Sequence, residues 1–86
     1  MTGAVPIDGI AEYGQRIGTR TKTILNASRK DADVSQSELA TMLGWTRNMV
    51  ANLESGRRVV RLTDFLLVAR ALRIEPERLL RRILQW

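Results

Sequence analysis

The sequence predicts an all-α protein that folds as one domain of five helices. A length of 86 residues leaves room for a single domain. Apolar residues make up 44% of the chain but aromatic residues only 5%, and the apolar residues are mainly Leu, Ile, Val and Ala, a mixture that favours helix over sheet. Apolar positions also recur at spacings of three and four, with Ser, Thr and Gly where helices should begin and end.

A long first helix is predicted to begin at Gly9. Six residues recur along one of its faces: Ile10, Tyr13, Ile17, Thr21, Ile24 and Ser28. Gly14 and Gly18 weaken this prediction, because a glycine inside a helix costs about 1 kcal/mol relative to alanine. The segment before it, Met1 to Asp8, has no periodicity and predicts a flexible N-terminal arm ahead of a domain that spans 9–86.

Two short helices follow, each with its own start and stop signals. Ser35 and Glu38 form a capping box for a helix from Gln36 to Leu43, and Gly44 suits a left-handed C-terminal cap. Thr46 can cap a third helix, from Arg47 to Ser55, which Gly56 would end. The expected inward residues of this pair are Leu39, Ala40, Leu43, Val50 and Leu53. Two short helices joined by a glycine-containing turn form a helix-turn-helix.

The last two helices come after a basic connection, Arg57 to Arg61. The fourth is predicted with Thr63 as its cap and with a buried face of five residues: Leu62, Phe65, Leu66, Ala69 and Leu72. The fifth should start at Pro76, a favoured first helical residue, and run to about Gln85. It carries Leu79, Leu80, Ile83 and Leu84.

Charge and composition narrow the classes of function. Lys and Arg number 14 against 9 Asp and Glu, giving a net charge of +5, which favours a polyanion partner, although an Arg-rich composition can also reflect a GC-rich genome. The chain has neither Cys nor His, so we expect no disulfide, no zinc site built on these ligands, no cofactor and no enzymatic activity. No membrane span or signal-peptide pattern is present, which predicts a cytoplasmic protein, associated with the nucleoid when bound to DNA.

A resemblance to a known family covers Ser35 to Ile74. The stretch SQSELATMLGWTRNMVANLESGRRVVRLTDFLLVARAL resembles the helix-turn-helix of the phage repressor and Cro type, the XRE family, and Ile74 to Leu80 resembles the usual start of its fifth helix. The resemblance implies a five-helix, lambda-repressor-like fold that binds double-stranded DNA. Two departures stand out. Trp45 replaces a small aliphatic residue and is expected to fill the core, and Val59 and Val60 replace a common Asn-Pro, which predicts a more extended loop.

The resemblance also implies roles for individual residues. Arg47, Asn48 and Asn52 would read base edges, and Met49 could contact a thymine methyl group. Arg can bind guanine O6 and N7 together, and Asn can bind adenine N6 and N7 together, although these residues could instead form a solvated polar face. The predicted phosphate contacts are Gln36, Thr46, Arg57, Arg58 and Arg61.

Glu54 matches an acidic residue that commonly pairs with an arginine of the first helix. Arg16, Arg20 and Arg29 are all candidates for that partner, and the sequence leaves the choice open.

These observations favour a transcriptional regulator, expected to be a repressor. The alternative is an antitoxin-like module that binds a partner protein and regulates its own operon. The fifth helix has more apolar surface than a short helix needs, so a homodimer on a palindromic operator is expected, unless these side chains only cover the domain's own core. The predicted dimer interface consists of Leu80, Ile83, Leu84 and Trp86.

Overall fold

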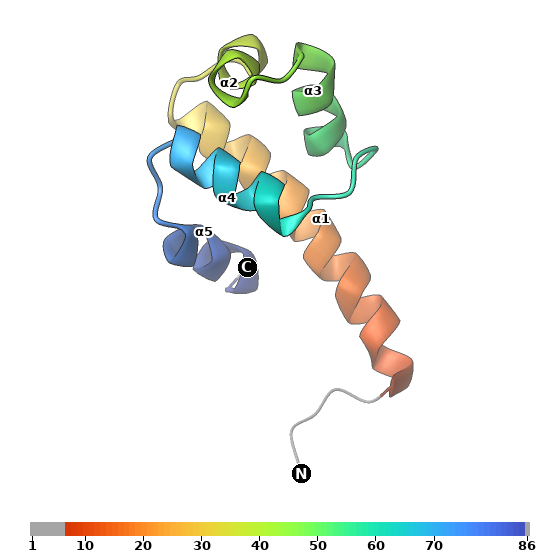
Figure 1. Ribbon diagram of the computed structural model, residues 1–86. Helices are drawn as coiled ribbons and strands as arrows, with labels where there is room; N and C mark the ends of the chain where they lie inside the picture. The colour runs from red at the N-terminus through yellow and green to blue at the C-terminus, as the bar shows by residue number, and fades with distance from the viewer. Residues whose placement is uncertain (1–6, 86) are drawn as a thin grey trace.

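The computed structural model describes residues 7–85, and within this range it contains five helices and no strand (Figure 1). The helices are α1 (Ile7–Asp31), α2 (Gln36–Leu43), α3 (Arg47–Ser55), α4 (Leu62–Ala71) and α5 (Pro76–Leu84). The all-α, five-helix prediction is confirmed. None of the helices in the described range is long and apolar enough to cross a membrane.

The caps of α2 and α3 form as predicted. The Ser35 hydroxyl accepts a hydrogen bond from the Glu38 amide at 3.0 Å, and the Glu38 carboxylate accepts one from the Ser35 amide at 2.8 Å. Gly44 ends α2 with φ at 71°, a left-handed conformation in which a side chain would be strained. Thr46 then caps α3 by accepting from the Met49 amide at 3.2 Å.

Two predicted helix starts differ from the structure. The first helix begins at Ile7 and not at Gly9, so the predicted arm is wrong for its last two residues, and its remainder, residues 1–6, lies outside the described residues. The fourth helix begins at Leu62 with Arg61 as its cap residue, in place of Thr63. The carboxylate of Asp64 accepts a hydrogen bond from the Arg61 amide at 3.1 Å, and this bond fixes the start of the helix.

The buried face of α4 also differs from the prediction. Leu62, predicted to face inward, is 74% exposed, and Leu66 is exposed as well. The core of the protein consists of Leu25, Leu39, Ala40, Val50, Leu53, Phe65, Val68, Ala69, Leu72, Leu79 and Ile83. Trp45 lies half-buried against this core, as expected.

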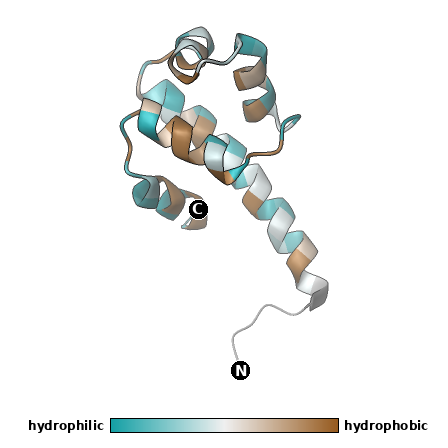
Figure 2. Cartoon of the chain, viewed as in Figure 1, coloured by the Kyte–Doolittle hydropathy of each residue, from teal (hydrophilic) through white to brown (hydrophobic). Residues whose placement is uncertain are grey.

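The C-terminal half of α1 is the part of that helix that packs against the other helices. That half contacts α3 on one flank and α5 on the other, while α2 and α4 pack against each other. The N-terminal half of α1 projects beyond the other helices (Figure 1). Hydrophilic and hydrophobic residues alternate along this half of the helix (Figure 2).

Candidate nucleic-acid interface

The predicted recognition residues lie at the exposed end of α3. The side chains of Arg47 and Asn48 are exposed, and those of Met49 and Asn52 are half-buried along the same helix. Val50 and Leu53, on the opposite face, are almost completely buried in the core. The inward face therefore fixes the rotation of α3, and the rotation directs the residues predicted to read DNA bases outward.

A buried ion pair holds α3 against α1. The two nitrogens of Arg29 donate to the two carboxylate oxygens of Glu54, Nε to Oε2 at 2.6 Å and Nη2 to Oε1 at 3.0 Å. The Arg29 and Glu54 side chains are only 8% and 6% exposed. Arg29, and neither Arg16 nor Arg20, is therefore the partner that the sequence left open. Its third nitrogen, Nη1, donates to the Val34 carbonyl at 2.7 Å.

Two side-chain amides complete the set of hydrogen bonds to Glu54. Asn26 of α1 donates to Oε1 at 2.7 Å, and Gln36 of α2 donates to the same oxygen at 3.1 Å. Burial alone would raise the pKa of Glu54. The hydrogen bonds from Arg29, Asn26 and Gln36 and the charge of Arg29 outweigh it, so the pKa of Glu54 lies below its ordinary value. One carboxylate thus joins α1, α2 and α3.

The residues predicted to contact phosphate occupy different environments. Thr46, Arg57 and Arg61 are exposed around the two ends of α3 and the start of α4. Gln36 is half-buried at the N-terminus of α2, with its amide directed to Glu54 as described.

Arg58 is half-buried and makes contacts within the protein. Its guanidinium lies 4.7 Å from the centre of the Trp45 ring and donates to the Asp64 carboxylate at 3.2 Å. Its Nε is buried and has no hydrogen-bond partner among the described residues. These contacts tie the connection after α3 to the turn and to α4, and the phosphate contact of Arg58 stays a prediction.

The residues predicted to form a dimer interface also differ in exposure. Leu80 is 47% exposed and Leu84 is 52% exposed. Ile83 is only 2% exposed, because it packs in the core with Leu79, and so it does not belong to a surface that a partner could reach. Trp86 lies outside the described residues.

The sequence interpretation missed two residues that shape this region. Asp64 is 4% exposed and holds both Arg58 and the start of α4, and its position three residues after Arg61 fits the acidic third residue of a helix start. Asn26 gave no comparable signal, because a polar residue on a helix is usually solvated. Within residues 7–85 no group of three acidic side chains lies close enough together to hold a metal ion.

Comparisons with known proteins agree with this geometry. A family model described as helix-turn-helix, HTH_3, matches residues 25–79. A search of curated proteins finds no match. Among solved structures, the crystal structure of the clp gene regulator ClgR from C. glutamicum is similar, with a TM-score of 0.74 and 23% sequence identity. The similarity covers 80% of this chain and 90% of that one. The matched segment contains α2 and α3 with the whole Glu54 network, and the chain belongs to the HTH_3 family of helix-turn-helix proteins, the XRE type.

Proposed function

We propose that this chain regulates transcription by binding an operator in double-stranded DNA through the major groove, and that it acts as a repressor. The observation that carries the proposal is the end of α3, where Arg47 and Asn48 are exposed while Val50, Leu53 and Glu54 hold the helix from behind. Residues near the N-terminus of a recognition helix are the ones that reach base edges.

The charges around α3 support the same proposal. Arg57 and Arg61 are exposed on the connection that follows the helix, where cations can contact phosphates without reading sequence. The N-termini of α2 and α3 add partial positive charge from their unpaired amides. Base readout by Arg47 and Asn48, with phosphate contacts from the arginines that follow, is the arrangement we propose.

Selection from a pool of random duplex DNA at roughly 150 mM salt tests the proposal. We expect a short palindromic motif to be enriched. Arg47→Ala should lower affinity for it by roughly 10- to 100-fold and relax the preference at particular base pairs, because a bidentate contact to a base would be lost. Asn48→Ala should relax different base pairs. Arg78→Ala is the matched control, because it removes an exposed arginine from α5, away from α3.

Arg57→Ala should behave differently from the readout variants. Loss of a phosphate contact should weaken binding to all sequences alike and reduce the slope of log affinity against log salt by about 1. Weak binding that is uniform across sequences and equally sensitive to salt in every variant would contradict the proposal. That result would favour the alternative, a module that binds a partner protein.

A further inference from the structure

Most of the net charge of the chain lies away from α3. Residues 70–82 contain five arginines and two glutamates, and so they carry three of the five net positive charges. The five arginines, all exposed, are Arg70, Arg73, Arg78, Arg81 and Arg82. They lie at the end of α4, in the turn that follows and on α5, and Figure 1 shows α5 across the bundle from α3. Operator binding by α3 therefore gives these arginines no role.

The fold pairs only one of these arginines with an acidic residue. Within residues 7–85, Arg82 alone among the five forms an ion pair, with the Asp31 carboxylate at 3.7 Å. Both side chains of this pair are exposed, so the pair contributes little to stability. Guanidinium groups bind carboxylates and phosphates through two parallel hydrogen bonds. Unpaired arginines gathered on one surface therefore favour an anionic partner.

Arg73 has a backbone conformation that arginine rarely adopts. Its φ is 58°, in the left-handed region that favours glycine. The Arg73 amide donates to the Arg70 carbonyl where α4 ends. The Gly44 amide donates to the Thr41 carbonyl in the same way where α2 ends, and Gly44 has a φ of 71°. Asp33 also has a positive φ, but aspartate tolerates this conformation better than arginine.

Glycine would suit position 73 better than arginine, and the fold offers nothing in return for the strain. The Arg73 side chain is exposed, and within the described part of the chain it forms no ion pair. Strained backbone of this kind is typical of positions where the side chain has a function. The surroundings of Arg73 indicate what that function is.

A hollow of about 630 Å³, which we call the α4–α5 hollow, lies beside Arg73. Its apolar lining consists of Leu66, Ala69, Ile74 and Pro76. Ala69 is completely buried and forms part of the floor, whereas Leu66 is 43% exposed. Arg70 and Arg73 border this apolar floor, and Glu75 is the one acidic residue of the lining. The hollow thus offers an apolar surface with two arginines beside it.

Arg73 also borders a second, smaller hollow on the other side of the turn. This hollow has a volume of about 370 Å³, and its lining includes Arg78 and Arg82. These two arginines are four residues apart on α5 and so lie on the same flank of that helix. The residues of the turn, 73–75, line both hollows. A segment lying across the turn would therefore meet arginines on both sides of the apolar floor.

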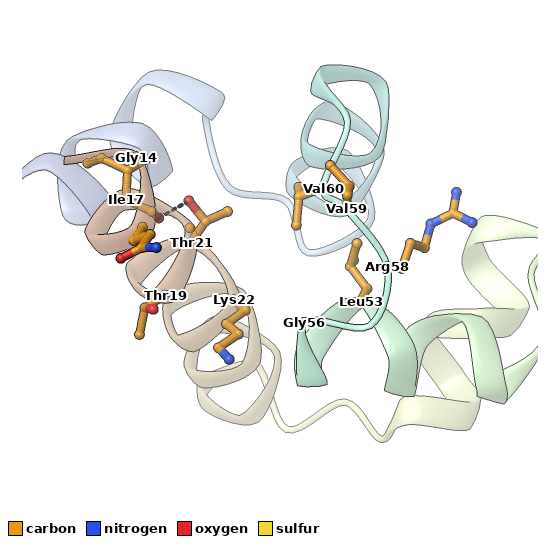
Figure 3. Close-up of a pocket in the computed structure, with 12 residues that line it drawn as sticks. Gly14, Ile17, Thr19, Thr21, Lys22, Leu53, Gly56, Arg58, Val59 and Val60 are labelled. Atoms are coloured by element: carbon orange, nitrogen blue, oxygen red, sulfur yellow. Dashed lines mark hydrogen bonds between the residues drawn. The ribbon is translucent and has the colours of Figure 1, made fainter. Parts of the chain in front are cut away.

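The hollow shown in Figure 3 lacks this grouping of charges. It has a volume of about 670 Å³ and lies between α1 and the connection from Gly56 to Val60. Its lining includes Lys22 and Arg58. The guanidinium of Arg58 extends away from α1 toward Trp45 and Asp64, which leaves Lys22 as the charge beside this hollow. Arginines around an apolar floor therefore distinguish the α4–α5 hollow.

We propose that the α4–α5 hollow binds an acidic segment of another protein, in which a leucine or isoleucine is flanked by Asp or Glu. The aliphatic side chain enters the hollow beside Leu66 and Ile74. The carboxylates pair with Arg70 and Arg73 on one side and with Arg78 on the other. Binding at this surface is independent of the proposed function, because α3 takes no part in it.

Three other occupants fit the hollow less well. A purely apolar segment would bury Arg70 and Arg73 without a counter-charge, which is costly. A nucleic acid supplies negative charge but has no aliphatic side chain for the floor. A second copy of the chain would bring its own arginines to the same surface, and like charges oppose association.

Selection from a library of random peptides displayed on phage, with the full chain as bait at roughly 150 mM salt, tests the proposal. We expect enrichment of peptides in which Leu or Ile lies next to Asp or Glu. For a synthetic peptide of the enriched sequence, measured by fluorescence anisotropy, Arg73→Gly should raise the Kd roughly 10-fold. Arg16→Ala, which removes an exposed arginine from α1, is the matched control and should leave the Kd unchanged.

The Arg73→Gly variant separates binding from folding. Because glycine suits a φ of 58°, the midpoint of thermal unfolding should stay the same or rise while peptide affinity falls. Binding to the DNA motif should be unchanged. Arg47→Ala should show the opposite pattern, with weaker DNA binding and unchanged peptide binding.

Two neighbouring leucines test the apolar part of the site. Leu66 and Leu67 are 43% and 41% exposed on the same helix, but Leu66 lines the α4–α5 hollow and Leu67 does not. Leu66→Ser should raise the Kd of the peptide roughly 10-fold, and Leu67→Ser should not. Serine in place of the leucine or isoleucine of the peptide should weaken binding by a similar factor.

Several results would overturn the proposal. One is a selection that enriches no acidic and aliphatic peptides, and another is an enriched peptide that binds Arg73→Gly or Leu66→Ser as tightly as the wild type. Tight binding of the serine-substituted peptide would mean charge attraction alone. Binding of RNA or of duplex DNA without the motif that Arg73→Gly abolishes would assign the surface to a nucleic acid. Failure of the proposed function is distinguishable, because it would remove the DNA motif and leave the peptide selection unchanged.

Discussion

The two halves of α1 differ in burial: the C-terminal half is covered by other helices, whereas the N-terminal half is exposed. In the C-terminal half, Leu25 is 1% exposed and Ser28 is also 1% exposed, and Arg29 is bonded to Glu54 beneath α3. In the N-terminal half, Ile10 is 52% exposed and continues the same stripe toward solvent. The contrast shows that an amphipathic pattern specifies which face of a helix is to be covered, but not whether the covering surface comes from the same chain.

Truncating one apolar residue in each half should give the largest difference between them. Leu25→Ala should lower the free energy of unfolding by roughly 3 to 5 kcal/mol, because it removes a fully buried side chain and leaves a cavity. Ile10→Ala should lower it by only about 0.5 kcal/mol in the monomer, because half of its side chain is exposed. Urea denaturation at concentrations where the chain is monomeric measures both values. Equal losses would mean that the projecting half packs against the body.

Removing the ion pair of the C-terminal half should have the second largest effect on the free energy of unfolding. Glu54→Gln keeps the shape of the side chain but leaves the guanidinium of Arg29 buried without a counter-charge, so the free energy of unfolding should fall by roughly 2 to 3 kcal/mol. Glu12→Gln, an exposed residue on the projecting half of the same helix, is the matched control and should change it by less than about 0.5 kcal/mol. Similar losses of unfolding free energy for the two variants would mean that the Glu54 network does not hold α3 in place.

The sequence predicts the features that depend on residues close together in the chain better than those that depend on tertiary contacts. The boundaries of α2 and α3 follow from caps within four residues, and Ser35, Gly44 and Thr46 were identified from those local rules. The start of α4 was misplaced because Thr63 is a plausible cap, and only the bond between Asp64 and the Arg61 amide selects the observed start. The choice of Arg29 as the partner of Glu54 depends on tertiary geometry that spacing alone does not contain.

The candidate site divides in a similar way. The outward position of Arg47 and Asn48 follows from the helical period once Val50 and Leu53 are placed inside. The internal role of Arg58 did not follow, because it requires Trp45 and Asp64 to meet around it from two other segments. Ile83 was assigned to a partner surface although it covers the chain's own core, since an apolar stripe does not reveal what it packs against.

The stability of the fold should depend on pH through Glu54, the carboxylate that bonds to the C-terminal half of α1. The pKa of Glu54 is below its ordinary value in the folded chain, so the unfolded state takes up protons first as the pH falls. Its contribution is fully present above the unfolded pKa of about 4.3 and is lost as the pH drops through the lower folded value. Thermal melts between pH 7 and pH 3 should therefore show a steeper loss of stability for the wild type than for Glu54→Gln. Parallel curves for the two proteins would contradict this assignment.

Replacing a glycine in the projecting half should give the smallest change, with the opposite sign. Gly14→Ala should raise the free energy of unfolding of the monomer by about 1 kcal/mol or less, because the added Cβ meets nothing within 4 Å and alanine favours helix. Gly44→Ala is the informative contrast, since Gly44 has a φ of 71° and alanine there should destabilise by about 1 kcal/mol. Urea denaturation measures both changes. A Gly14→Ala variant that is no more stable than the wild type would contradict the open surroundings of Gly14.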